Sequence, residues 1–170
     1  LARRNIPFVK FGGLRFLDSV HVKDVLAVLR WAQNPRARVA DFRVLQLMPG
    51  VGPATAAQVL DAVAAAGELP AALAAYRPPA RASSDWPAFA ALMTEAGAAR
   101  TPWPAQFEQV RRWYEPHLER NHEDAITRHA DILQMESLAA TFASCERFLT
   151  ELTLDPPDAT SGESGVPYVD

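Results

Sequence analysis

The chain has 170 residues, of which 49% are hydrophobic and 22% charged, a composition typical of a folded globular protein. It contains no run of about 18 apolar residues, so the sequence predicts no membrane span. The N-terminus shows neither an initiator Met nor the apolar core of a signal peptide. We therefore expect a cytoplasmic protein, represented by a piece of a longer chain.

The net charge of -3 is unevenly distributed along the chain. Residues 1–50 carry nine basic and three acidic side chains, a net of +6, whereas the remainder carries a net of -9. A polyanionic partner would therefore meet the first third. Fifteen of the seventeen basic residues are arginine. This bias suits bidentate phosphate contacts, although a GC-rich genome would produce the same bias.

The first predicted elements lead up to a glycine-rich turn. Residues 6–11 alternate and are predicted to form a short strand, which Gly12-Gly13 ends. Asp18 or Ser19 can cap a helix that ends near Asn34-Pro35. A second helix is predicted to follow, then a turn over residues 49–53 and a third helix over residues 54–66. The apolar positions assigned to the first two helices are Val22, Val25, Leu26, Leu29, Val39, Phe42, Val44, Leu45 and Leu47.

The second half of the chain is also predicted to be helical. A loop is expected over residues 78–84, then helices over 86–96, from Pro102 or Pro104 to about Leu118, and over 142–152. A further helix between the last two has its apolar positions at Ile126, Ala130, Leu133 and Leu138. From Asp155 onward the composition is that of a linker or tail. The fold class expected is mainly α, with a short N-terminal strand or turn segment.

The turn carries the clearest functional pattern. Residues 44–56 have the form of a helix-hairpin-helix, in which two glycines flank one small apolar residue and a proline opens the next helix. The free amides and positive end of that helix can hold a phosphate without reading base sequence. The predicted DNA-binding residues are Gly50, Val51, Gly52, Pro53, Ala54 and Thr55, joined by the basic residues Lys10, Arg15 and Lys23, with Arg30 on the same predicted face. A tight helix–helix turn without a ligand is the alternative.

Other patterns of catalytic chemistry are weak. No histidine pair has the spacing of a zinc-binding helix, and no phosphate-binding loop for ATP is present. We expect the four histidines to lie on the surface or to be partly packed, and the tryptophans and Tyr114 to belong to the core. The single cysteine, Cys145, is expected to be a buried small hydrophobe rather than a reactive thiol. No catalytic residue, metal or cofactor is predicted in this chain.

Five short motifs follow one another within residues 5–55: Ile6-Pro7-Phe8, Gly12-Gly13, Val22-Lys23-Asp24-Val25-Leu26, Asn34-Pro35 and the hairpin glycines. In their order and spacing they resemble superfamily 1 DNA helicases of the UvrD/PcrA/Rep type. The resemblance implies that residues 1–17 are the edge of the RecA-like subdomain 2A, that 18–152 form the helical 2B subdomain, and that 153–170 return towards 2A.

In such a parent, the 2B subdomain contacts duplex DNA or a fork junction and packs against the motor domains. The resemblance places ATP and Mg²⁺ in the parent helicase, outside this chain. A regulatory protein is a further expected partner. Two other functions remain open: a protein-interaction module with a purely structural hairpin, and a helix-hairpin-helix DNA glycosylase, for which Asp61 is the nearest carboxylate but lacks the expected sequence context.

Overall fold

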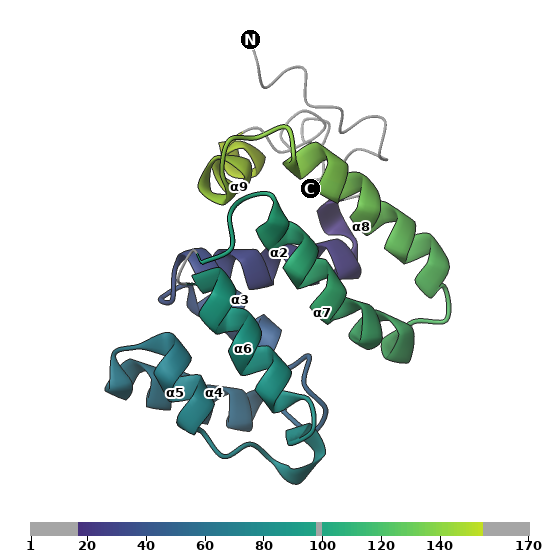
Figure 1. The fold of residues 1–170 in the computed structure, drawn as a ribbon. Helices are drawn as coiled ribbons and strands as arrows, with labels where there is room; N and C mark the ends of the chain where they lie inside the picture. The colour runs from purple at the N-terminus through teal and green to yellow at the C-terminus, as the bar shows by residue number, and fades with distance from the viewer. Residues whose placement is uncertain (1–16, 98–99, 155–170) are drawn as a thin grey trace, which may run out of the picture.

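The computed structural model describes residues 17–97 and 100–154, and within these ranges the chain forms helices and connecting turns without a strand (Figure 1). The predicted mainly helical fold is confirmed for this part of the chain. The predicted strand over residues 6–11, together with Lys10 and Arg15, lies outside the described residues, as does the segment from Asp155. No described helix combines the length and the apolar character needed to cross a membrane.

The helix boundaries follow the prolines, glycines and asparagine noted in the sequence. Asn34 caps the first described helix, and Gly67, with φ of 76°, ends another in the left-handed region. A helix over residues 69–75 is an addition that the apolar patterns did not predict. In chain order the helices are α2 (Val20–Gln33), α3 (Arg38–Leu45), α4 (Pro53–Ala66), α5 (Leu69–Ala75), the 3₁₀ turn η3 (Ala80–Ala82), α6 (Trp86–Gly97), α7 (Ala105–Asn121), α8 (Ala125–Ala139) and α9 (Cys145–Leu154).

Helix α2 is the central element of the fold. It contacts α3, α6, α7, α8 and α9, and Figure 1 shows it between α4 and α5 at one end and α8 and α9 at the other. Between His21 and Ala32, every residue of α2 is buried except Lys23 and Arg30. A helix enclosed on nearly all sides is expected to be apolar around most of its circumference, as α2 is.

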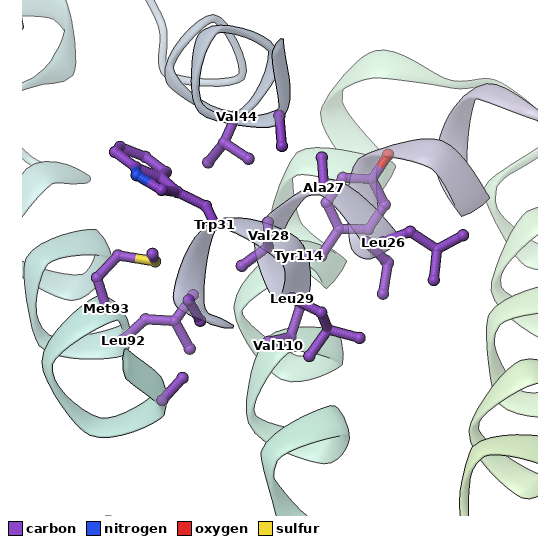
Figure 2. Packing of buried hydrophobic residues seen from close by; sticks show 14 of the residues in the cluster. Leu26, Ala27, Val28, Leu29, Trp31, Val44, Leu92, Met93, Val110 and Tyr114 are labelled. Atoms are coloured by element: carbon purple, nitrogen blue, oxygen red, sulfur yellow. The ribbon is translucent and has the colours of Figure 1, made fainter. Parts of the chain in front are cut away.

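The core packs around this helix. Figure 2 shows Trp31 of α2 near Val44 of α3 and Met93 of α6, with Val110 and Tyr114 of α7 beside the same helix. Trp31 also lies 5.7 Å from Phe89, measured between ring centroids. The predicted core role of the aromatic residues is confirmed, since Trp86 and Tyr114 are buried and Trp103 and Trp113 pack against the core. Cys145 is buried as predicted.

The predicted apolar face of the helix over residues 125–139 is wrong at three of its four positions, while the fourth, Leu138, is buried as predicted. Ile126 is 90% exposed and Leu133 is 41% exposed, and Ala130 is exposed as well. The buried face of α8 instead consists of Ile132, Met135, Leu138 and Ala139. The assignment of Val39 to the apolar face of α3 is also wrong, because this residue is 89% exposed. In both helices apolar residues recur at helical spacing on more than one face, so the pattern did not identify the packed face.

Two of the four histidines are more deeply placed than the sequence predicted. His21 and His117 are each 3% exposed. His21 Nε2 lies 2.9 Å from an Asp131 carboxylate oxygen, and Arg128 Nη1 lies 3.0 Å from His21 Nδ1. Burial lowers the pKa of His21, while Asp131 acts in the opposite direction. These contacts join α2 to α8 across the core.

Candidate nucleic-acid interface

The turn between α3 and α4 is built from backbone hydrogen bonds around two glycines. The amides of Leu47 and Met48 donate to the carbonyls of Val44 and Leu45 at 3.0 and 3.2 Å, which continues the end of α3 by a tight turn. The Val51 amide donates to the Met48 carbonyl at 3.1 Å. Val51 is 6% exposed, so its side chain points inward.

Gly50 and Gly52 have different roles in this turn. Gly50 has φ of 81°, a left-handed conformation that a residue with a side chain rarely adopts. Gly52 has φ of -101° and ψ of -170°, an ordinary extended conformation, and a Cβ added there would meet nothing within 4 Å. The turn therefore requires glycine at position 50. At position 52 it does not, so the space in front of Gly52 is open.

The N-terminus of α4 presents unpaired amides to this open space. Pro53 occupies the first turn, and the Ala56 amide donates to the Gly52 carbonyl at 2.9 Å. The amides of Ala54 and Thr55 precede the first intrahelical bond and have no partner among the described residues. The first turn of α4 holds no acidic residue, and Pro53 and Ala54 are exposed. The partial positive charge at this end of the helix is therefore not neutralised.

Arg81, which sequence reasoning missed, lies against the hairpin. Its Cβ is 2.9 Å from the position that a Cβ on Gly50 would occupy, so the absence of a side chain at Gly50 allows η3 to approach the turn. Arg81 is exposed and makes no ion pair within the described residues. No local pattern indicates this neighbour, because η3 is brought to the turn only by the packing of α5 and α6.

Of the basic residues predicted to join the hairpin, Lys23 and Arg30 lie in the part of the chain that the structure describes. Lys23 and Arg30 of α2 line a hollow of about 540 Å³ between α2, α3 and α9, which none of residues 49–55 lines. We call this the α2–α3 groove; its lining residues are Leu17, Asp18, Lys23, Leu26, Ala27, Arg30, Ala37, Arg38, Val39, Ala40, Arg43 and Leu152. The groove that Lys23 lines therefore does not include the turn over residues 49–55.

Ion pairing divides the described cations into two groups. Arg111, Arg112, Arg120, Arg128 and Arg147, on α7, α8 and α9, each lie within 4.0 Å of a carboxylate. In the described part of the first half of the chain, only Arg43 is paired, with Asp24 at 2.8 Å. The remaining cations there, Lys23, Arg30, Arg36, Arg38, Arg77 and Arg81, have no ion pair with a described residue. Among the described residues, the arginines and lysines without an ion pair therefore lie mainly in the first half of the chain, with the exposed Arg100 as the exception in the second half.

Asp41 is a buried carboxyl group with one oxygen that has no hydrogen-bond donor among the described residues. It lies on α3 and is 1% exposed, and the oxygen without a donor is Oδ1. Burial raises the pKa of Asp41 to about 7, while Arg38 acts in the opposite direction. Asp41 lines a second hollow of about 340 Å³ with Arg36, Arg38, Leu60 and Val63.

The described residues contain no group of three or more histidine, cysteine, aspartate or glutamate side chains arranged to hold a metal ion. Compared with protein-family models, with curated proteins and with solved structures, the chain finds no match in any of the three.

Proposed function

We propose that this chain is the regulatory, duplex-contacting 2B subdomain of an ATP-dependent DNA helicase of the UvrD/PcrA/Rep type. It binds backbone phosphates without sequence specificity, through a helix-hairpin-helix. Residues 18–152 form this subdomain, flanked by the edge of 2A over 1–17 and the return segment over 153–170. ATP and Mg²⁺ are bound by the parent's motor domains, so the fragment itself is not catalytic.

The observation that carries this proposal is the arrangement at the start of α4. The unpaired amides of Ala54 and Thr55, the open space at Gly52 and the unpaired Arg81 lie at one turn. Backbone amides at a helix N-terminus bind phosphate oxygens, and an adjacent guanidinium adds a charge-assisted hydrogen bond. Such a site fixes a protein on a duplex without contacting base edges.

A binding measurement tests the proposal. Duplex binding of the 170-residue chain is measured by fluorescence anisotropy at several salt concentrations, with Gly52→Leu and Arg81→Ala compared with wild type. Because an added Cβ at Gly52 meets nothing within 4 Å and the backbone there is extended, the leucine is expected to block close approach of a phosphate while the fold is kept. Gly52→Leu is expected to weaken duplex binding about tenfold, and Arg81→Ala is expected to reduce the slope of log affinity against log salt by about 0.9.

Ala65→Leu is the matched control, because Ala65 is an exposed residue far along the same helix. It should bind duplex like the wild type. Equal binding by Gly52→Leu and wild type would remove the hairpin from the interface, and ATP hydrolysis by the purified chain would contradict the assignment as a whole.

A second function, a protein-interaction module, is favoured by one observation on α8. Ile126, Ala130 and Leu133 are exposed and lie at helical spacing, so they form an apolar stripe on the outer face. Exposed apolar residues that cluster mark protein contacts more often than isolated ones do. In this case residues 85–152 dock a partner helix, and the hairpin has a structural role.

The two functions make different predictions for this stripe. Ile126→Glu with Leu133→Glu should leave duplex binding unchanged if the hairpin is the DNA contact. The double variant should abolish crosslinking of a photoreactive group at Ala130 to the parent's motor domains or to a regulatory protein. Retained crosslinking in the double variant would rule out the stripe as a docking surface.

A further inference from the structure

Helix α2 reaches the surface along one narrow face. This helix is buried on every other side, and its two residues that reach the surface between His21 and Ala32 are both cations. Lys23 and Arg30 are seven residues apart, two helical turns, so they lie on one face. Leu26 and Ala27, between them, form the apolar floor of the α2–α3 groove.

Arg30 is the half-buried cation of this groove that has no ion pair with a described residue. Burial lowers the pKa of Arg30. Placing a guanidinium in a partly dehydrated position without a carboxylate costs free energy. An anionic ligand would offset this cost.

The opposite wall adds charge of the same sign. Arg38 of α3 is exposed and has no ion pair with a described residue, and Arg43 is already paired with Asp24. Asp18 is the one carboxylate among the lining residues. Three cations without an ion pair to a described residue therefore face one acid across a hollow with an apolar floor; Arg38 also acts on the buried Asp41, where it opposes the rise in pKa that burial causes.

We propose that the α2–α3 groove binds a phosphodiester strand of single-stranded nucleic acid, with Arg30, Lys23 and Arg38 holding its phosphates. A recessed arginine can be reached by the phosphate of a flexible single strand, whereas the rigid cylinder of a duplex cannot enter the hollow. Guanidinium groups bind phosphate oxygens in pairs, and the apolar floor accommodates the sugar and base faces. The groove would thus supply the fragment with a second nucleic-acid contact, of a different kind from the hairpin.

The inference rests on the proposed function, because a fork presents both duplex and single strand to one subdomain. The geometry permits a single fork to reach both sites. Helix α3 carries Arg38 and Arg43 and leads directly into the hairpin, and its eight residues span about 12 Å. That length is well under one turn of duplex, which is about 34 Å.

The test measures binding of a fluorescein-labelled ten-nucleotide oligothymidylate to the full 170-residue chain over a range of salt concentrations. Arg30→Gln is expected to weaken oligothymidylate binding about tenfold. It is also expected to reduce the slope of log affinity against log salt by about 0.7. Arg30→Lys should recover part of the affinity, since it keeps the charge and loses the bidentate geometry. Lys23→Gln gives a second variant at an exposed position that does not risk the fold.

Arg112→Gln is the matched control. Arg112 is an arginine whose side chain is 69% exposed on α7, paired with Glu108 away from the groove. It should bind oligothymidylate like the wild type. The hairpin variant Gly52→Leu should also bind the oligonucleotide normally while losing duplex, so the two sites can fail independently.

The binding results distinguish a site for single-stranded nucleic acid from a site for an acidic peptide and from the absence of a site. Loss of oligothymidylate binding in Arg30→Gln with duplex binding retained supports the groove, whether or not Gly52→Leu affects duplex. No binding by the wild-type chain, or equal binding by wild type, Arg30→Gln and Lys23→Gln, overturns it. Direct binding of labelled poly-glutamate by the wild-type chain that is lost in Arg30→Gln, with oligothymidylate bound equally by both proteins, would assign the groove to an acidic peptide and would also overturn it.

Discussion

The hydroxyl of Tyr114 on α7 donates a hydrogen bond to Asp24 on α2, with the two oxygens 2.5 Å apart in the protein interior. Asp24 is 4% exposed, and its other carboxylate oxygen accepts from Arg43 Nε at 2.8 Å. Burial, reinforced by Asp24, raises the pKa of Tyr114, so the hydroxyl keeps its proton and remains a donor. The buried carboxylate is thus satisfied from α7 and α3 at once, and it ties both helices to the central one.

Tyr114→Phe should lower the free energy of unfolding by ~1–3 kcal/mol, because it leaves a buried carboxylate oxygen without its donor. Urea denaturation measures the change. Tyr76→Phe is the control, since the Tyr76 hydroxyl has no hydrogen-bond partner among the described residues and the side chain is half-buried. Equal destabilisation by the two variants would show that the Tyr114 hydroxyl contributes nothing specific.

The left-handed glycines allow a second stability test. Gly67→Ala should cost about 1 kcal/mol from backbone torsion alone, because its φ is 76° and an added Cβ meets nothing within 4 Å. Gly50→Ala has a similar φ but also meets Arg81 Cβ at 2.9 Å, so it should cost about 1 kcal/mol more. Thermal unfolding measures both changes.

Adding Arg81→Gly to Gly50→Ala should recover the difference, because it removes the contacting Cβ. If Gly50→Ala and Gly67→Ala were equally destabilised, the approach of η3 to the hairpin would be looser than its contact distance indicates. The comparison also tests directly whether Arg81 is held at the turn.

Asp41 should make stability depend on pH. Its pKa in the folded chain is about 7, above the 3.8 of an ordinary aspartate, because it is buried. Between pH 4 and pH 7 the unfolded chain therefore binds fewer protons than the folded one, and this group lowers stability as the pH rises. Asp41→Asn should be more stable than wild type by ~2–4 kcal/mol at pH 8, and the two should converge near pH 4. A difference that stayed constant from pH 4 to pH 8 would contradict the raised pKa.

Local signals predicted most helix boundaries. Asn34-Pro35 and Gly67 end helices, and Pro53 begins one, because each acts through its own backbone torsions or missing amide. The helix over residues 69–75 is short and alanine-rich, and without a distinct apolar period it gave no signal. Which face of a helix is packed depends on its neighbours, and this is why Ile126 and Leu133 were assigned to the core in error.

Only those features of the candidate site that depend on residues adjacent in sequence could be predicted. The inward Val51 and the glycine and proline positions of the turn follow from residues adjacent in sequence. The contact of Arg81 with Gly50 comes from the tertiary packing of later helices, and so does the groove that Lys23 lines. Charge counting along the chain identified the basic N-terminal third, but only the structure shows which of its cations are unpaired.

The thiol of Cys145 should be unreactive in the folded protein. The residue is 3% exposed, and burial raises its pKa to about 12, so almost no thiolate exists at pH 8. Iodoacetamide should therefore fail to label the native chain and should label it fully in denaturant. The labelled fraction should follow the unfolding curve measured by circular dichroism. Fast labelling of native protein would show that the start of α9 opens locally.

His117 should produce a pH dependence opposite in sign to that of Asp41. It is buried, and Arg120 Nη2 lies 2.9 Å from its Nδ1 atom. Because a guanidinium can only donate, Nδ1 accepts and the ring is neutral. Burial lowers the pKa of His117 and Arg120 lowers it further, while Asp85, the Leu47 backbone and Asp24 act in the opposite direction.

Below about pH 6.5 the unfolded chain therefore binds a proton that the folded chain resists, and stability falls as the pH drops towards 5. His117→Gln removes this contribution while keeping a group that can accept from Arg120. The gap in free energy of unfolding between wild type and His117→Gln should shift in favour of the variant from pH 7.5 to pH 5. His21, whose pKa is also lowered, is present in both proteins and cancels from the difference. Parallel stability curves for the two proteins would mean that His117 is protonated as readily in the folded chain as in the unfolded one.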